Sequence, residues 1–251
     1  MKIVVIGGTG LIGSQVVTGL KDLGHEVIAA SPSSGVNTIS GEGLSEVLQG
    51  AEVVVDVPNS PSFEEKAVMD FFTTSEKNLL AAAKLAGVKH LVALSIVGVD
   101  REGANAYFLA KLAQENLIKS SGISYSLLRA TQFYEFVGGI AASGTVGDEI
   151  HVSPAVFQPV ASSDVVAALV NIANSTPLNG TAEVAGPEKI ALDEIVKQYL
   201  KLKGDTSVVI TDPSAFYFGA AVNDSTLVPG ENPIIGRYTY KEWINIPGNL
   251  R

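Results

Sequence analysis

The chain has 251 residues, of which 46% are hydrophobic and 17% charged, a balance typical of a globular protein with a large buried core. Its formal net charge of -9 argues against an extended basic surface for nucleic acid or anionic lipid. The absence of cysteine excludes disulfides, thiolate metal ligands and cysteine nucleophiles, and it is consistent with a reducing compartment.

The N-terminus leads directly into a strand pattern, without the charged, apolar and small-residue segments of a secretory signal. The longest apolar stretch, near residues 91–99, is too short to cross a bilayer. We therefore expect a cytoplasmic protein that binds neither membrane nor nucleic acid. The three histidines lack carboxylates at ligand spacing, so we expect no metal site.

Short β-branched segments alternate with longer segments of helical period in the first half of the chain. The alternation predicts an α/β fold with a Rossmann-type, doubly wound parallel sheet. We expect strands at residues 2–6, 26–30, 52–56, 91–96 and 125–129, and a short additional strand near residues 36–38. We expect helices at residues 11–23, 43–49, 62–85 and 106–120. Glycines in the left-handed conformation are expected to end helices before strands, at Gly24, Gly50, Gly87 and Gly122.

Past Arg129 the pattern changes, because glycine, proline and aromatic residues become frequent and only residues 163–174 and 192–203 have a clear helical period. We therefore expect the sheet to end near residue 130. The sequence predicts a dinucleotide-binding region over residues 1–134 and a smaller, irregular substrate-binding region over residues 135–251. No linker separates them, so both are expected within one compact domain.

The segment IGGTGLIG, residues 6–13, carries four glycines between the first strand and the first helix. In this arrangement a dinucleotide pyrophosphate binds the N–H groups at a helix N-terminus. Gly7 would form the turn, Gly10 would let the phosphates approach, and Gly13 would let the helix pack closely. We predict that the cofactor contacts Gly7, Thr9, Gly10, Leu11, Ile12 and Gly13. The alternative is a tight strand–helix turn without a ligand.

The second strand ends in AASPSS, residues 29–34, and lacks the carboxylate that usually binds the ribose 2′-OH in an NAD site. The hydroxyls of Ser31, Ser33 and Ser34 could receive a 2′-phosphate, although no Lys or Arg occurs between positions 21 and 66. The missing acid favours NADP(H) over NAD(H). The alternative interpretation of the serines is a surface turn.

Tyr107 and Lys111 are four residues apart in a predicted helix and therefore share one face. An ammonium beside a phenol would lower the pKa of the tyrosine, and such a pair can pass a proton to a carbonyl oxygen. Ser95 lies at the carboxyl end of the preceding strand, where open α/β sheets bind their ligands. We predict that these three residues are catalytic and that Lys111 also contacts the cofactor. A second pair, Tyr199 and Lys203, fits a solvated amphipathic helix.

Each of these residues also has a plain structural interpretation. The Ser95 hydroxyl could bond to backbone, and Tyr107 could pack on the sheet edge. We further expect Val57, Asn59 and Thr131 to contact the cofactor. Residues after the last expected strand are predicted to contact the substrate, with the aromatic ones forming an apolar wall or part of the core: Gln132, Phe133, Phe136 and Phe157.

These segments resemble the short-chain dehydrogenases/reductases, specifically the NmrA-like, atypical branch that binds NAD(P)H. The resemblance rests on GGTGLIG, GHEVIAAS, NLLAAAKLAGVKHLVALS, YFLAK and SGISYSLLRATQFYEF, and it covers most of the chain. It implies that Ser95 orients a substrate carbonyl and that Tyr107 donates or accepts the proton. It also implies that Lys111 contacts the nicotinamide ribose and lowers the pKa of Tyr107.

Taken together, the residues and the resemblance predict a carbonyl reductase that transfers hydride between NAD(P)H and a small ketone or alcohol, apolar or aromatic in character. One alternative is a non-catalytic NAD(P)-binding redox sensor that acts through a protein partner. Another is reduction of a quinone or of an activated C=C bond. The sequence leaves oligomer formation open, with the helices at residues 62–85 and 106–120 as a candidate dimer face.

Overall fold

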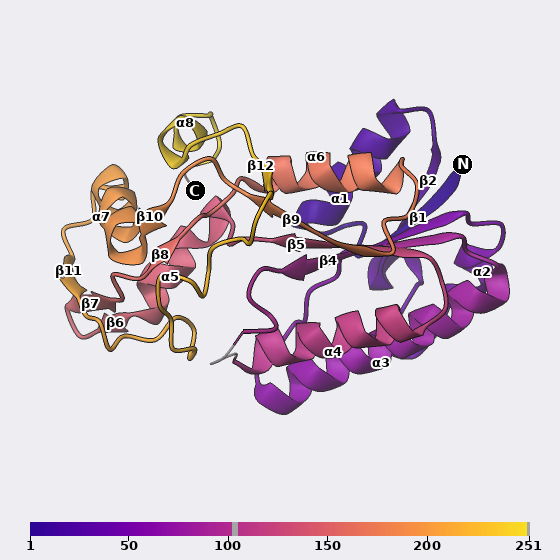
Figure 1. The fold of residues 1–251 in the computed structure, drawn as a ribbon, viewed down its shortest axis with the longest axis horizontal. Helices are drawn as coiled ribbons and strands as arrows, with labels where there is room; N and C mark the ends of the chain where they lie inside the picture. The colour runs from indigo at the N-terminus through magenta and orange to yellow at the C-terminus, as the bar shows by residue number, and fades with distance from the viewer. Residues whose placement is uncertain (102–104, 250–251) are drawn as a thin grey trace. The chain divides into compact units, whose positions relative to one another are not determined.

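The computed structural model describes residues 1–101 and 105–249 (Figure 1). A seven-stranded sheet has the order β12-β9-β5-β4-β3-β1-β2, and the pairs β1–β2, β1–β3, β3–β4 and β9–β12 are parallel. Its strands are β1 (Lys2–Ile6), β2 (Glu26–Ala30), β3 (Val53–Asp56), β4 (His90–Ile96), β5 (Tyr125–Ala130), β9 (Gly180–Ala185) and β12 (Ile234–Ile235). The predicted Rossmann-type α/β fold is confirmed.

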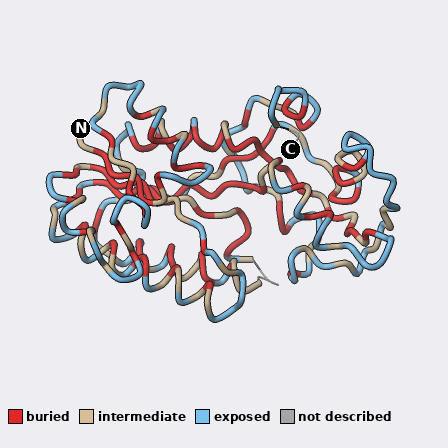
Figure 2. Tube along the Cα trace, turned by 180° about the vertical axis from the view of Figure 1, so that it is seen from behind, coloured by how far each residue is buried: buried red, intermediate tan, exposed pale blue. Residues whose placement is uncertain are grey.

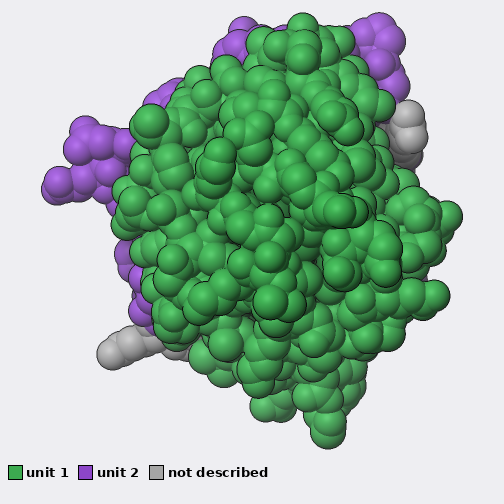
Figure 3. Space-filling view, turned by 90° about the vertical axis from the view of Figure 1, so that its right-hand side faces the viewer, with its two compact units in different colours: residues 1–96, 106–129, 165–182 green, residues 97–105, 130–164, 183–251 purple. Residues whose placement is uncertain are grey.

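Two compact units divide the chain, and each is described by itself. Unit 1 contains residues 1–96, 106–129 and 165–182, whereas unit 2 contains residues 97–105, 130–164 and 183–251 (Figure 3). The units are not consecutive in sequence, since residues 165–182 lie in unit 1. They therefore differ from the predicted division into residues 1–134 and 135–251, which assigned that segment to the substrate-binding region.

Unit 1 holds the strands β1 to β4, most of β5, and five helices: α1 (Leu11–Asp22), α2 (Leu44–Leu48), α3 (Glu65–Ala86), α4 (Ala106–Ser120) and most of α6 (Ser162–Ala173). The helices α3 and α4 run along one face of the sheet, and α1 and α6 run along the other (Figure 1). Strands covered on both faces need continuous apolar sequence, as in the KIVVI of β1 and the VVVD of β3. Burial is accordingly concentrated in these strands (Figure 2).

The predicted left-handed glycines are confirmed, with φ of +81° at Gly24, +73° at Gly50, +72° at Gly87 and +79° at Gly122. Gly87 shows the reason, because its N–H donates to the carbonyls of Ala83 and Lys84 at the end of α3. A residue with a Cβ would meet a steric penalty in that conformation.

Two expectations about the strands are wrong. Residues 36–38 form no strand: Gly35 turns the chain with φ +80°, and Val36 is buried in the core instead of pairing. The sheet also continues past residue 130 through β9 and β12. The sequence signals for β9 and β12 are weak, because β9 shows little alternation of buried and exposed residues and β12 consists of two exposed residues.

Unit 2 contains α5 (Val137–Ser143), α7 (Leu192–Lys203) and α8 (Tyr240–Ile244). It also contains a pair of strands, β8 (Val156–Phe157) with β10 (Ile190–Ala191), and a small sheet of β6 (Thr145–Val146), β7 (Glu149–Val152) and β11 (Val208–Thr211). Short 3-10 helices occur at Pro32–Ser34 in unit 1 and Tyr134–Phe136 in unit 2. In the part of the chain that the structure describes, no helix has both the length and the apolar character needed to span a bilayer.

Candidate functional site

The glycine loop, residues 7–13, is packed against the ends of β2 and β3. The N–H groups of Gly7 and Gly8 both donate to the carbonyl of Ala30, at 2.9 and 3.2 Å. Gly7 has φ +75°, and a Cβ placed on it would lie 2.8 Å from the nitrogen of Pro58 and 3.1 Å from the carbonyl carbon of Val57. The loop therefore requires glycine at position 7, and it brings residues 57–59 beside it.

The two remaining glycines of the motif have different surroundings. A Cβ on Gly13 would lie only 2.1 Å from the carbonyl oxygen of Gly7, so α1 approaches the loop as closely as backbone allows. A Cβ on Gly10 would meet nothing nearer than 3.4 Å, and Gly10 is exposed. Gly10 is the N-cap residue of α1 and provides no side-chain hydrogen bond to the first turn. This uncapped, bare helix start fits a bound phosphate group, because its N–H groups need an acceptor.

The neighbouring residues of the loop divide between surface and core. Thr9 and Leu11 are exposed together with Gly10, whereas Ile12 is buried. Thr9 and Leu11 are thus accessible at the surface beside Gly10, and Ile12 anchors the helix in the core.

The serines after β2 form a compact turn. The Ser31 and Ser33 hydroxyls are 2.8 Å apart, and the Ser34 hydroxyl donates to the carbonyl of Ser31 at 2.9 Å while accepting from the Ser31 N–H. Ser33 and Ser34 are exposed. The structure therefore shows the turn that was the alternative interpretation, with two hydroxyl-bearing residues still at the surface.

Tyr107 lies in the first turn of α4, and its hydroxyl donates to the Oδ1 atom of Asn59 at 2.8 Å. Its ring contacts Phe63 and Phe72, with centroid distances of 5.6 and 5.7 Å. Since Asn59 follows the Pro58 on which Gly7 packs, the phenol and the glycine loop contact the same segment of unit 1. The expected low pKa of Tyr107 is wrong, because burial raises the pKa of this phenol to about 12.

Lys111 explains that difference. Its Nζ atom donates to the carbonyl of Leu94 at 2.7 Å and to the Gln114 side chain, and it lies 4.5 Å from the centroid of the Phe72 ring. Burial lowers the pKa of Lys111 to about 8, against the attraction of nearby carboxylates. The ammonium is thus directed toward the interior, where it interacts with Gln114 and carboxylates.

The carboxylates are those of Asp56 and Glu76, which form a buried polar cluster with Lys111 and Gln114. The sequence analysis did not predict this cluster. The Gln114 Nε2 atom donates to Asp56 Oδ2 at 2.6 Å and to Glu76 Oε2 at 2.8 Å. Burial raises the pKa of Asp56 to about 6 and, together with the Asp56 charge, raises the pKa of Glu76 well above its usual range. A signal existed in the sequence, because Glu76 shares the apolar face of α3 with Phe72 and Leu79.

Ser95, at the end of β4, lies near a second buried carboxylate. Glu115 accepts from Arg129 through Nε and Nη2, at 2.8 and 2.7 Å, and from Lys119 at 2.9 Å. Burial raises the pKa of Glu115, but the hydrogen bonds from Arg129 and Lys119 outweigh this effect, so the pKa lies below its usual value. The Ser95 Oγ atom is itself buried and has no hydrogen-bond partner among the described residues. Tyr107 and Lys111 each donate to other groups, so the three predicted catalytic side chains have separate surroundings.

The predicted residues after β5 belong to unit 2. Thr131 and Gln132 are buried, and their Oγ1 and Oε1 atoms have no hydrogen-bond partner among the described residues. Phe133 and Phe136 stack with centroids 5.7 Å apart, and Phe136 is 50% exposed. Phe157 is fully buried where β8 pairs with β10, so its ring is part of the core of unit 2.

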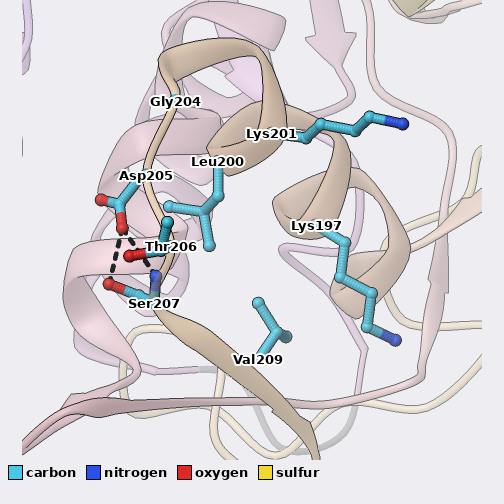
Figure 4. Close-up of a pocket in the computed structure, with 8 residues that line it drawn as sticks. All are labelled: Lys197, Leu200, Lys201, Gly204, Asp205, Thr206, Ser207 and Val209. Carbon is cyan, nitrogen blue, oxygen red and sulfur yellow. Dashed lines mark hydrogen bonds between the residues drawn. The ribbon is translucent and has the colours of Figure 1, made fainter.

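Of two surface depressions, one is lined in part by a predicted site residue and the other is not. One, of about 340 Å³, lies in unit 1 beside β2 and α2 and includes Ser34 in its lining. The other, of about 540 Å³, lies at the end of α7 in unit 2, where the Asp205 carboxylate binds Ser207 and the side chains of Lys197 and Lys201 point away from it (Figure 4). The second depression contains none of the predicted site residues.

Comparison with known proteins gives a match to a family model described as NAD(P)H-binding, over residues 7–176. The chain is 28% identical over 220 residues to the (4-alkanoyl-5-oxo-2,5-dihydrofuran-3-yl)methyl phosphate reductase of Streptomyces griseus, which covers 80% of this chain and 74% of that protein. It is 31% identical over 171 residues to the chloroplastic divinyl chlorophyllide a 8-vinyl-reductase of Cucumis sativus, which covers 55% of this chain and 40% of that protein.

Among solved structures, the dTDP-4-dehydrorhamnose reductase of Yersinia enterocolitica matches with a TM-score of 0.74. The two chains are 19% identical, and the match covers 100% of this chain and 99% of that chain. At this identity the likeness shows the fold alone.

We predict that Gly13→Ala mainly lowers stability, whereas Gly10→Ala mainly weakens cofactor binding. The first places a Cβ against the Gly7 carbonyl and should lower the free energy of unfolding by about 2–3 kcal/mol. The second has space and should cost less than about 1 kcal/mol, yet it should weaken NADPH binding at least tenfold by filling the cradle. Thermal denaturation and fluorescence titration with NADPH measure the two effects. Unchanged NADPH affinity in Gly10→Ala would contradict binding at this loop.

We predict that Glu76→Gln makes the stability less dependent on pH. A carboxyl whose pKa is raised by folding binds more protons in the folded state, so its ionisation lowers stability as pH rises through the folded pKa. For Asp56 this loss falls between about pH 4 and 6, and for Glu76 it reaches higher pH. Glutamine preserves a hydrogen-bond donor without ionising.

The melting temperature of Glu76→Gln should exceed that of the unchanged protein by about 2–4 °C at pH 8, and the difference should shrink toward pH 4.5. Glu26→Gln, at an exposed position, serves as the control and should change neither value. A lower melting temperature for Glu76→Gln at pH 8 would show that the ionised carboxylate stabilises the fold.

Proposed function

Because the chain belongs to the NAD(P)H-binding family of NmrA-like, atypical short-chain dehydrogenases/reductases, we propose that it reduces an apolar small molecule that bears a carbonyl group. Bound at the glycine loop, the nicotinamide cofactor supplies the hydride. Tyr107 supplies the proton. The observation that carries this proposal is the Tyr107 hydroxyl, held on Asn59 in the same segment that packs against Gly7.

The protonation state of Tyr107 favours reduction over oxidation. With its pKa raised to about 12, the phenol is protonated at neutral pH; it is a weaker acid than an ordinary tyrosine but still acidic enough to protonate the alkoxide that reduction of a carbonyl forms. Oxidation of an alcohol would need a phenolate to accept a proton, and the Lys111 ammonium that would stabilise it is directed toward Leu94 and Gln114. The proposal does not extend to Lys111, whose hydrogen-bond partners are Leu94 and Gln114, or to Ser95, whose hydroxyl is buried.

Reduction of an activated C=C bond is a second candidate. The name of the Streptomyces griseus relative describes a dihydrofuran ring that carries oxo and alkanoyl groups, and the Cucumis sativus relative is named as a vinyl reductase. In a conjugated substrate the charge that develops on the carbonyl oxygen would attract the same Tyr107 proton. The two candidates therefore share the proton donor and differ in the bond reduced.

We predict that Tyr107→Phe lowers kcat at least about 100-fold, because it removes the proton donor and keeps the ring contacts with Phe63 and Phe72. NADPH oxidation is measured with a panel of aryl ketones and conjugated enones, and product analysis identifies the bond reduced. The matched control is Tyr199→Phe, in the chain's second Tyr-x-x-x-Lys segment, which should retain full kcat. Full turnover by Tyr107→Phe would remove this residue from the mechanism.

The Tyr107→Phe variant should bind NADPH within about threefold of the unchanged protein, since the phenol is not part of the glycine loop. NADPH binding by the unchanged protein without turnover on either class of substrate would instead support a redox sensor that acts through a protein partner.

We propose NADP(H) as the cofactor, because residues 29–34 carry no carboxylate and keep Ser33 and Ser34 at the surface. NADPH should therefore bind more tightly than NADH in fluorescence titrations. Ser33→Asp adds a negative charge at an exposed position, so it should weaken NADPH binding at least tenfold and leave NADH binding nearly unchanged. Equal loss for both dinucleotides would place the 2′-phosphate elsewhere.

A further inference from the structure

Phe218 occupies a strained backbone position in unit 2. Tyr217 and Ala220 exchange backbone hydrogen bonds of 2.8 and 2.9 Å across a two-residue turn, and both central residues have positive φ, +46° at Phe218 and +81° at Gly219. Such turns favour Asn, Asp or Gly at the first central position, because a bulky side chain is sterically disfavoured there. Local strain of this kind is a reason to look for a function.

The strain is not explained by burial, because Phe218 is 46% exposed. The turn is held in place by the Asn105 side chain, which donates to the Phe218 carbonyl at 3.2 Å, and by the edge contact of the Tyr217 and Phe218 rings. A Cβ placed on Gly139 would lie 3.6 Å from the Phe218 Cζ atom, so the ring lies against α5. The turn thus presents an aromatic ring beside a helix position that lacks a side chain.

Two further aromatic rings accompany that position. Phe136 is one turn before Gly139, is 50% exposed, and stacks on Phe133 with an interplanar angle of 18°. Phe136 is the N-cap of α5, three residues before Gly139, so the stacked pair of Phe133 and Phe136 lies at the start of the helix that the Phe218 ring contacts. We call Phe133, Phe136 and Phe218 the aromatic face; flat rings around an unfilled glycine position suit a planar apolar group.

We propose that the aromatic face binds a planar apolar group and that Phe218 determines this specificity. An Asn at position 218 would form the same turn with less strain. We infer that Phe218 lowers the stability of the turn and that its exposed ring contributes to binding. The inference rests on the proposed function only where it identifies the bound group as part of the substrate.

The test uses Phe218→Asn and the planar ketone 2-acetonaphthone as the probe, with binding measured by calorimetry and stability by thermal denaturation. Relief of strain should raise the melting temperature by about 2–4 °C, and loss of the ring should weaken probe binding about tenfold. The control is Phe216→Asn, which removes a phenylalanine that is 66% exposed and two residues away, and should change the affinity less than twofold.

Unchanged probe affinity in Phe218→Asn, or no binding to the unchanged protein, would overturn the inference. A lower melting temperature would also overturn it, because Phe218 would then be a packing residue. The measurement does not require turnover: a probe that binds through Phe218 but is never reduced would contradict the proposed function and leave this inference standing.

Discussion

The contact between the start of α1 and the loop that precedes it is the constraint on which the rest of unit 1 depends. The space between Gly13 and the Gly7 carbonyl is too small for a single methyl group, and Gly7 itself is pressed against Pro58. Together with the hydrogen bonds from Gly7 and Gly8 to Ala30, these contacts hold the ends of β1, β2 and β3 together, and they leave the first turn of α1 open at Gly10. The same loop arrangement therefore explains both the close packing at Gly7 and Gly13 and the accessible backbone at Gly10.

The interior of unit 1 contains charged side chains of a kind that most protein cores exclude. Lys111, Asp56 and Glu76 share Gln114 as a hydrogen-bonding partner, and the raised pKa values of the two carboxyls show that burial outweighs their attraction to the ammonium. This cluster also draws Lys111 away from Tyr107. The phenol is then left in an apolar setting with Asn59 as its acceptor, where it remains a proton donor.

The sequence was sufficient for the fold class and for most elements of unit 1, but it predicted only part of the sheet and only part of the candidate site. Strand and helix positions in unit 1 followed from periodicity, and Gly87 followed from its role as a helix cap. The helical spacing of Tyr107 and Lys111 placed them on one face, but it could not show that Lys111 would turn to the carboxylates of distant elements. Likewise β12 was missed because two residues carry no period, and pair only through contacts remote in sequence.

The interleaving of the two units limits how the chain can be shortened. Residues 165–182 follow a long segment of unit 2, yet α6 covers one face of the sheet of unit 1, where the Val170 side chain occupies the space beside Gly19. Truncation near residue 134 would keep the whole glycine loop and still uncover that face. A fragment made this way would expose apolar surface and tend to aggregate, so the nucleotide-binding half cannot be produced as a simple N-terminal piece.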